Sequence, residues 1–134
     1  YAKISGPLLD RIDIQLDVPE VKFRDIVSRA PAEPSAAIRA RVVRARERQA
    51  ARFAGGGLFA NARMGPKDVK RFCVLPDEAE RLLEAAVARL GLSARAFDRI
   101  LKVARTIADL EGSDGIAAAH VAEAVQYRMM DRLR

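Results

Sequence analysis

The sequence has little of several residue types that define well-known classes of protein. It has no tryptophan, aromatic residues make up 5% of it, and Cys73 is its only cysteine. An intramolecular disulfide is therefore excluded, and a reducing compartment, the cytoplasm, is expected. One cysteine and one histidine, His120, far apart in the sequence do not make a metal site. No apolar run approaches the about 20 residues of a membrane-spanning helix, and no signal peptide is recognisable.

What is present favours helices and a basic surface. Alanine, leucine, arginine and glutamate dominate the 134 residues, and all four are strong helix formers, so a mainly helical domain is expected. Lysine and arginine number 24 against 18 acidic residues, for a formal net charge of +6. A basic balance favours polyanions such as nucleic acid or nucleotide phosphates. A solvated arginine-rich surface explains the charge as well, and the charge alone leaves both interpretations open.

The segment 12–18 alternates between apolar and polar residues and predicts a half-buried strand. Val18-Pro19 ends this strand, because proline cannot donate to a ladder. A lone strand is not stable, so another part of a longer protein would have to pair with it. Since the chain starts at Tyr1, we expect it to be part of such a longer protein.

Helical periodicity accounts for most of the remaining chain. Ser35 and Ser93 have the position of N-caps, while Gly91 and Gly112 end helices. Cys73 and His120 are interpreted as core or capping residues, and Tyr127 and Arg128 as structural ones. The expected helices cover residues 22–29, 36–53, 66–75, 76–90, 94–110 and 117–132.

The expected helix 36–53 has two distinct faces. An apolar stripe would pack inward, and the other faces are rich in arginine with Glu47 as the only acid. These arginines could contact DNA phosphates, or form a solvated or intersubunit surface. A glycine-rich loop follows. Phe53 and Phe59 are expected to anchor this loop rather than to be platforms on which bases stack. The stripe consists of Ile38, Val42, Ala45, Gln49 and Phe53, and the arginines are Arg39, Arg41, Arg44, Arg46, Arg48 and Arg52.

The chain carries no recognisable catalytic apparatus of its own. It lacks the G-x-x-x-x-G-K-[ST] loop that cradles phosphates, and a Ser-His-Asp set cannot be assembled around one histidine. Two arginines are notable by position. Arg11 precedes the expected strand and could present its guanidinium to a phosphate across an interface, or form a local salt bridge with Asp10 or Asp13. Arg95 lies in the first turn of a helix, where the dipole disfavours a cation, so it either faces an anion or is solvent-exposed.

Four segments carry a family resemblance: "SGPLLDRIDIQLDVP", "NARM", "LGLSARAFDRILKVARTIADLEG" and "IAAAHVAEAVQYR". In this order they resemble the C-terminal part of Mg-chelatase-like AAA+ ATPases, and within these the competence-related ComM subgroup. The resemblance spans nearly the whole chain.

The resemblance implies roles for both arginines. Arg11, in the "LLDRID" element, would be the arginine finger that reaches the γ-phosphate of ATP held by a neighbouring subunit. Arg95, in "SAR", would be the sensor 2 residue that contacts the nucleotide phosphates, in cis or in trans. Residues 1–20 would be the end of the ATPase core, with its last strand, and residues 21–134 a helical lid.

The resemblance also implies a function for the longer protein. It would be a hexameric ring that uses ATP and Mg²⁺ and acts on DNA, as a branch-migration helicase in recombination or transformation. The alternative is a chelatase-type subunit that remodels a protein partner for magnesium insertion into a tetrapyrrole. No resident cofactor is expected in the 134 residues alone.

Overall fold

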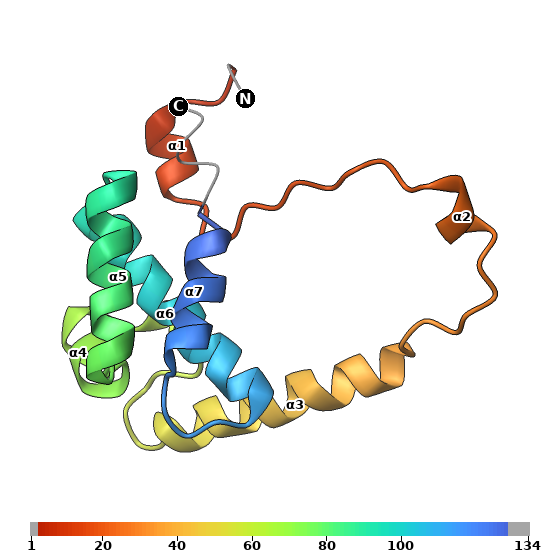
Figure 1. Cartoon of the computed structure of the whole chain (residues 1–134). Helices are drawn as coiled ribbons and strands as arrows, with labels where there is room; N and C mark the ends of the chain where they lie inside the picture. Colours follow the sequence, from red (N-terminus) through yellow and green to blue (C-terminus); the bar gives the residue numbers. More distant parts are fainter. Residues whose placement is uncertain (1–2, 129–134) are drawn as a thin grey trace.

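The computed structural model describes residues 3–128, and this part of the chain is helical. Figure 1 shows the helices and the long connection between the second and the third. No residue of the described part is in a strand. The elements are α1 (Gly6–Asp10), α2 (Phe23–Ile26), α3 (Ser35–Arg52), η1 (Asn61–Arg63), α4 (Pro66–Phe72), α5 (Asp77–Leu90), α6 (Ala94–Glu111) and α7 (Ala118–Gln126).

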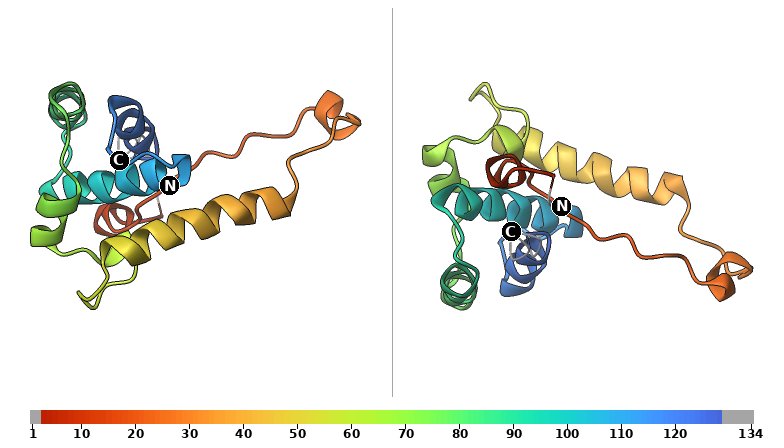
Figure 2. Two further views of the ribbon diagram at one scale, coloured as in Figure 1. Left: turned by 90° about the horizontal axis from the view of Figure 1, so that it is seen from below. Right: turned by 90° about the horizontal axis from the view of Figure 1, so that it is seen from above.

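Helix α6 is the centre of the bundle. It packs against α3 and α7 and also contacts η1 and α4, while α5 packs on α7. Figures 1 and 2 show α6 crossing between α3 and the pair formed by α5 and α7. The buried face of α6 includes Ile100, Leu101 and Ala104. The mainly helical fold predicted from the sequence is therefore confirmed.

Helix α6 begins and ends where the sequence predicts. Ser93 is its N-cap and accepts a hydrogen bond from the backbone N–H of Ala96 at 3.0 Å. Gly112 ends it with a φ of 82°, in the left-handed region that a side chain disfavours. Gly91 ends α5 in the same way, with a φ of 63°.

Replacing Ser93 with alanine is expected to lower the free energy of unfolding by about 1 kcal/mol, because an orphan N–H at the start of α6 loses its partner. Ser35→Ala is the matched control. The structure makes Pro34 the N-cap of α3 and Ser35 its first residue, with no side-chain cap bond, so the prediction that Ser35 caps this helix is wrong. Chemical denaturation of both variants measures the difference, and equal losses would contradict the capping role of Ser93.

The predicted stripe on α3 is correct only in its C-terminal half. Ala45, Gln49 and the following Phe53 are buried, whereas Ile38 is 44% exposed and Val42 43% exposed. The N-terminal half of α3 extends beyond the bundle (Figure 1), so its apolar residues have no described helix to pack on.

The predicted strand at residues 12–18 is wrong for this structure. The segment is extended, and its pattern of burial is the reverse of the expected one. Gln15 is buried, and its backbone N–H donates to the carbonyl of Tyr127 at 2.9 Å, while Leu16 is 65% and Val18 83% exposed. The physical reason is that no described segment offers a strand edge, so the apolar side of the alternation stays uncovered.

Residues 16–34 form an arch away from the bundle (Figure 1). The helix predicted at 22–29 is reduced to the single turn of α2, and Phe23 within it is 77% exposed. At the other end of the chain, α7 ends at Gln126, and the remainder of its predicted extent from residue 129 lies outside the described residues.

The loop after α3 is fixed at both ends. Phe53 and Met64 are buried, and Leu58 packs partly against the core. The ring of Phe53 meets that of Phe72 edge to face, with centroids 5.3 Å apart. Phe59, however, is 79% exposed, so its expected role as an anchor is wrong.

Candidate nucleotide-phosphate contact site

Arg11 lies immediately after the short helix α1. Ser5 caps this helix by accepting from the backbone N–H of Leu8 at 3.3 Å, and Leu9 is buried against the body. Arg11 is the C-cap, and its backbone N–H donates to the carbonyls of Leu8 and Leu9. The backbone at Arg11 is therefore held in place, while its side chain is exposed.

The end of α1 is joined to the start of α6. The hydroxyl of Ser93 donates to the Asp10 carboxylate at 3.2 Å, and the guanidinium of Arg128 lies 3.3 Å from the same oxygen. A carboxylate at the N-terminus of a helix is favoured by the helix dipole. This contact brings the neighbour of Arg11 in sequence against the N-cap of the helix that carries Arg95.

Both acidic neighbours of Arg11 bind other arginines. Asp10 pairs with Arg128, and Asp13 pairs with Arg99 on α6. Within residues 3–128, Arg11 has no ion pair. The local salt bridge that the sequence left open is thus not formed.

Arg95 occupies the second position of α6 and is exposed. No carboxylate of the described residues pairs with it. Because Ser93 binds Asp10, the two predicted site residues extend from adjoining ends of α1 and α6. Both cationic side chains are thus exposed at adjoining helix ends and have no carboxylate partner among the described residues.

Arg128 is a residue whose part in this site the sequence did not reveal. The structural role expected for it is confirmed, because its side chain is fully buried. It donates to the backbone carbonyls of Ile12 and Asp10 and so fixes the segment after α1 to the end of α7. The only signal in the sequence is its place at the end of the family segment "IAAAHVAEAVQYR", because its partners lie at the other end of the chain.

A buried polar network lies at the opposite end of α6. Asp109 is 1% exposed and receives two hydrogen bonds from Arg52 on α3, at 2.9 and 2.5 Å. Asn61, from the "NARM" segment, donates to Asp109 at 2.9 Å, and its backbone N–H donates to Gln49 at 2.9 Å. Arg105 lies 3.4 Å from Asp109, and its burial lowers its pKa. The network clamps α3 and η1 to α6.

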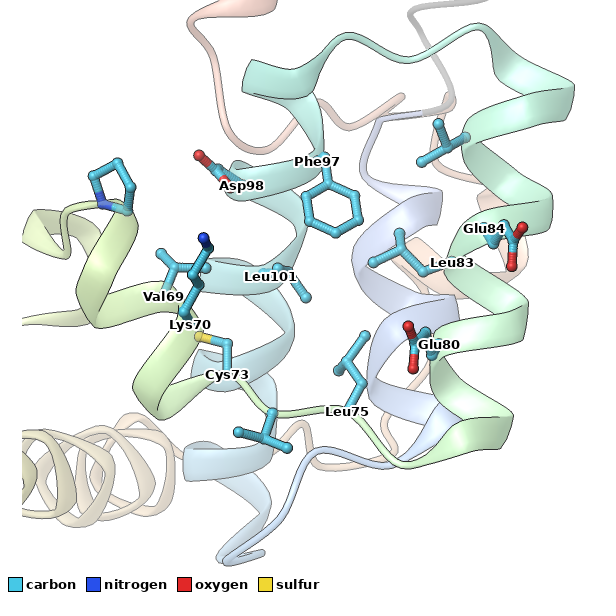
Figure 3. A pocket seen from close by; sticks show the side chains of 13 residues that line it. Val69, Lys70, Cys73, Leu75, Glu80, Leu83, Glu84, Phe97, Asp98 and Leu101 are labelled. Atoms are coloured by element: carbon cyan, nitrogen blue, oxygen red, sulfur yellow. The ribbon is translucent and has the colours of Figure 1, made fainter.

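A cavity of about 600 Å³ opens between α4, α5 and α6 (Figure 3). Its lining is mostly apolar, with the carboxylates of Glu80, Glu84 and Asp98 against the single cation Lys70, so it does not suit a nucleotide phosphate. Cys73 also lines it, and burial raises the pKa of this thiol to about 11. A thiol that stays protonated at neutral pH is not a nucleophile, which agrees with the expected core role.

His120 is confirmed as a capping residue. Its Nδ1 accepts from the backbone N–H of Ala117 at 2.9 Å at the start of α7, and its Nε2 contacts the Glu111 carboxylate. Within residues 3–128, no group of three or more His, Cys, Asp and Glu residues is placed to hold a metal ion. The same part of the chain has no helix long and apolar enough to cross a membrane.

The residues at the junction of α1 and α6 fit the phosphates of a nucleotide but not its metal ion. Arg11 and Arg95 are exposed cations without a described carboxylate partner, which suits phosphate oxygens. Oxygen ligands for Mg²⁺ are not gathered there, because Asp10 and Asp13 already bind arginines. Any nucleotide met by this site would have to be held mainly by other residues.

The described residues form a mainly helical bundle of the AAA+ lid type. Over residues 32–128 the chain matches the family described as "Magnesium chelatase, subunit ChlI C-terminal", and it belongs to that family.

The chain is 44% identical over 133 residues, 98% of its length, to the protein YifB of Salmonella typhimurium. The competence protein ComM of Haemophilus influenzae is 44% identical over 132 residues, also 98% of this chain. A Mycobacterium tuberculosis protein, Rv2897c, is 38% identical over 128 residues, 94% of this chain. The chain spans 25% of the length of each of these relatives. The resemblance to Mg-chelatase-like proteins and ComM inferred from the sequence is thereby confirmed.

Proposed function

We propose that this chain is the C-terminal part of a cytoplasmic ATP-dependent AAA+ ring motor that acts on DNA as a branch-migration helicase. Residues 1–20 would end the ATPase core and residues 21–134 would form the lid. Arg11 would act in trans as the arginine finger, and Arg95 as the sensor 2 residue. ATP and Mg²⁺ would be held by other parts of the full-length protein, in a hexamer.

The observation that carries this proposal is that the side chain of Arg11 is exposed and has no ion pair within the described residues. Its backbone is fixed by α1, its two acidic neighbours bind other arginines, and its side chain is exposed. An arginine that serves a phosphate on another subunit needs these three properties, because a local carboxylate would compete with the phosphate. Arg95 adds a second cation at the adjoining helix end, where phosphate would also be favoured by the helix dipole.

These groups would act on the phosphates by position and charge. Bound ATP supplies the phosphoryl group that is transferred to water. Arg11 would stabilise negative charge that develops on the γ-phosphate, and Arg95 would orient the phosphates from the N-terminus of α6. Because α6 is clamped to α3 at its other end, a shift at Arg95 would move the lid as a body.

A chelatase-type motor that remodels a protein partner remains the second candidate, favoured by the family description itself. The net charge of +6 favours DNA as the partner. The two candidates differ in what ATP hydrolysis drives. An assay of ATP-dependent strand movement in DNA therefore distinguishes them.

The test uses the full-length protein with a labelled four-way DNA junction. We expect ATP-dependent conversion of the junction, and Arg95→Ala is expected to weaken ATP binding about tenfold or more, the value of a hydrogen bond to a charged group. Arg89→Ala, an exposed arginine at the end of α5, is the control and should leave ATP binding unchanged. ATP hydrolysis without any strand movement would contradict the DNA motor and favour the chelatase-type alternative.

A further inference from the structure

One surface of the bundle combines an exposed aromatic side chain with unpaired cations. It consists of the loop 54–60, η1 and α4, which lie beside one another at one end of the molecule (Figures 1 and 2). From Arg48 to Pro76 the sequence has six cationic residues and one acid, Asp68. The function proposed above does not use these cations.

Two of these cations form ion pairs within the bundle and are not available to a ligand. Arg48 pairs with Asp114, and Arg52 with Asp109. The acid is also engaged, because the Asp68 carboxylate accepts from the backbone N–H of Gly65 at 2.9 Å. The other four cations are exposed and have no ion pair within residues 3–128: Arg63, Lys67, Lys70 and Arg71.

Three of these cations share one face of a helix. Lys67, Lys70 and Arg71 have the spacing i, i+3 and i+4 in α4, which places them side by side. The opposite face of α4 carries Val69, which is buried in the core. The helix therefore presents Lys67 and Arg71 as a row of positive charge on a packed support, and Lys70 continues this row at the rim of the cavity that Glu80, Glu84 and Asp98 also line.

Phe59 projects from the loop that precedes η1 and α4. Its side chain is 79% exposed although both of its flanks are fixed, by Leu58 against the core and by the buried Asn61. The backbone N–H of Asn61 donates to Gln49, and its side chain binds Asp109. The buried network thus fixes the base from which Phe59 projects, and an aromatic ring so fixed loses little entropy on binding.

We propose that Phe59 and the cations of η1 and α4 form a binding surface for single-stranded nucleic acid. Cations that follow a backbone and an aromatic ring on which a base stacks are the two components of such surfaces. The DNA contact is thereby assigned to loop 54–60 and α4 rather than to α3. Helix α3 keeps three exposed arginines without an ion pair in the described part of the chain, Arg39, Arg44 and Arg46, but it contains no aromatic residue on which a base could stack. The inference rests on the proposed DNA motor for its biological context, but it is tested by binding alone.

The test measures fluorescence anisotropy of a labelled oligo-dT strand with the full-length protein, without nucleotide. Phe59→Ala is expected to weaken binding about tenfold, the value of one stacked base. The control is Phe23→Ala, which removes a ring of similar exposure, 77% against 79%, from the arch. An equal effect of both substitutions, or no effect of Phe59→Ala, would overturn the stacking role.

A second pair of variants tests the charges. Replacing Lys67, Lys70 and Arg71 with glutamine is expected to reduce the slope of log affinity against log salt by about 2, since each phosphate contact contributes about 0.7. The same change of Arg39, Arg44 and Arg46 on α3 is the matched control and should leave the slope unchanged. A loss confined to the α3 variant would overturn the proposal.

Competitors identify the ligand class. Binding to duplex DNA or to polyglutamate as tight as to oligo-dT would contradict a surface for single strands.

ATP turnover without DNA, measured on the same α4 variant, separates this inference from the proposed function. Retained turnover with weakened oligo-dT binding supports both, and retained turnover with unchanged binding overturns only the surface. Absent turnover in the wild-type protein, with oligo-dT binding that is lost in the variant, overturns only the motor.

Discussion

Replacing Arg11 with alanine in the full-length protein is expected to lower ATP turnover by about a thousandfold or more, the typical value of an arginine finger. ATP binding should be largely unchanged, because the finger acts on charge that develops during hydrolysis and not on the ground state. The measurement is steady-state ATPase activity together with the equilibrium binding of a fluorescent ATP analogue.

Two controls make this expectation specific. Arg24→Ala removes another exposed arginine, from α2, and should leave turnover unchanged. Adding Arg11→Ala subunits to wild-type protein should reduce turnover in mixed rings, because each altered subunit disables the site of its neighbour. Wild-type turnover in the Arg11→Ala protein would refute the assignment of the finger.

Replacing Asp109 with alanine is expected to lower the free energy of unfolding by about 3–5 kcal/mol, the usual cost of removing one partner of a buried ion pair. Asp109 accepts hydrogen bonds from Arg52 and Asn61 and forms an ion pair with Arg105, and its side chain is fully buried. Its loss leaves two arginines without their carboxylate in a desolvated place. Urea denaturation followed by circular dichroism measures the change.

Asp114→Ala is the matched control for this prediction. Asp114 also binds an arginine, Arg48, but the Asp114 side chain is fully exposed. Exposed ion pairs contribute at most about 1 kcal/mol, so this variant should be almost as stable as the wild type. Similar losses in the two variants would show that the buried network does not hold α3 to α6.

The parts of the fold that the sequence predicted correctly depend on local signals. Helix α6 has an apolar period, a serine N-cap and a terminal glycine within 20 residues, and its bounds follow from them. Helix α5 likewise has acidic residues in its first turn and Gly91 at its end. Such signals act between near neighbours, so they can be read without knowledge of the tertiary structure.

The errors arose where a residue depends on distant partners. The alternation at 12–18 describes a segment suited to a sheet, but no described strand lies beside it, and Gln15 packs inward instead of the apolar residues. The apolar character of Phe59 predicts an anchor, but its neighbours Leu58 and Asn61 pack inward while Phe59 itself is exposed. The contacts of Arg128 with residues 10 and 12 join opposite ends of the chain, and no local pattern indicates them.

At the candidate site, too, the sequence indicates the residues but not their distant partners. The positions of Arg11 and Arg95 are compatible with phosphate contact, but the sequence also allows a local salt bridge for Arg11 and solvent exposure for Arg95. Only the structure shows that Asp10 and Asp13 bind Arg128 and Arg99. This pairing removes the local alternative for Arg11, because both candidate carboxylates are engaged elsewhere.

The most direct measurement is the structure of the full-length ring with a non-hydrolysable ATP analogue and Mg²⁺, at a resolution that shows side chains. The account predicts the guanidinium of Arg11 at hydrogen-bond distance from a γ-phosphate oxygen of the nucleotide bound to the neighbouring subunit. A ring in which this side chain lies far from every bound triphosphate would contradict it.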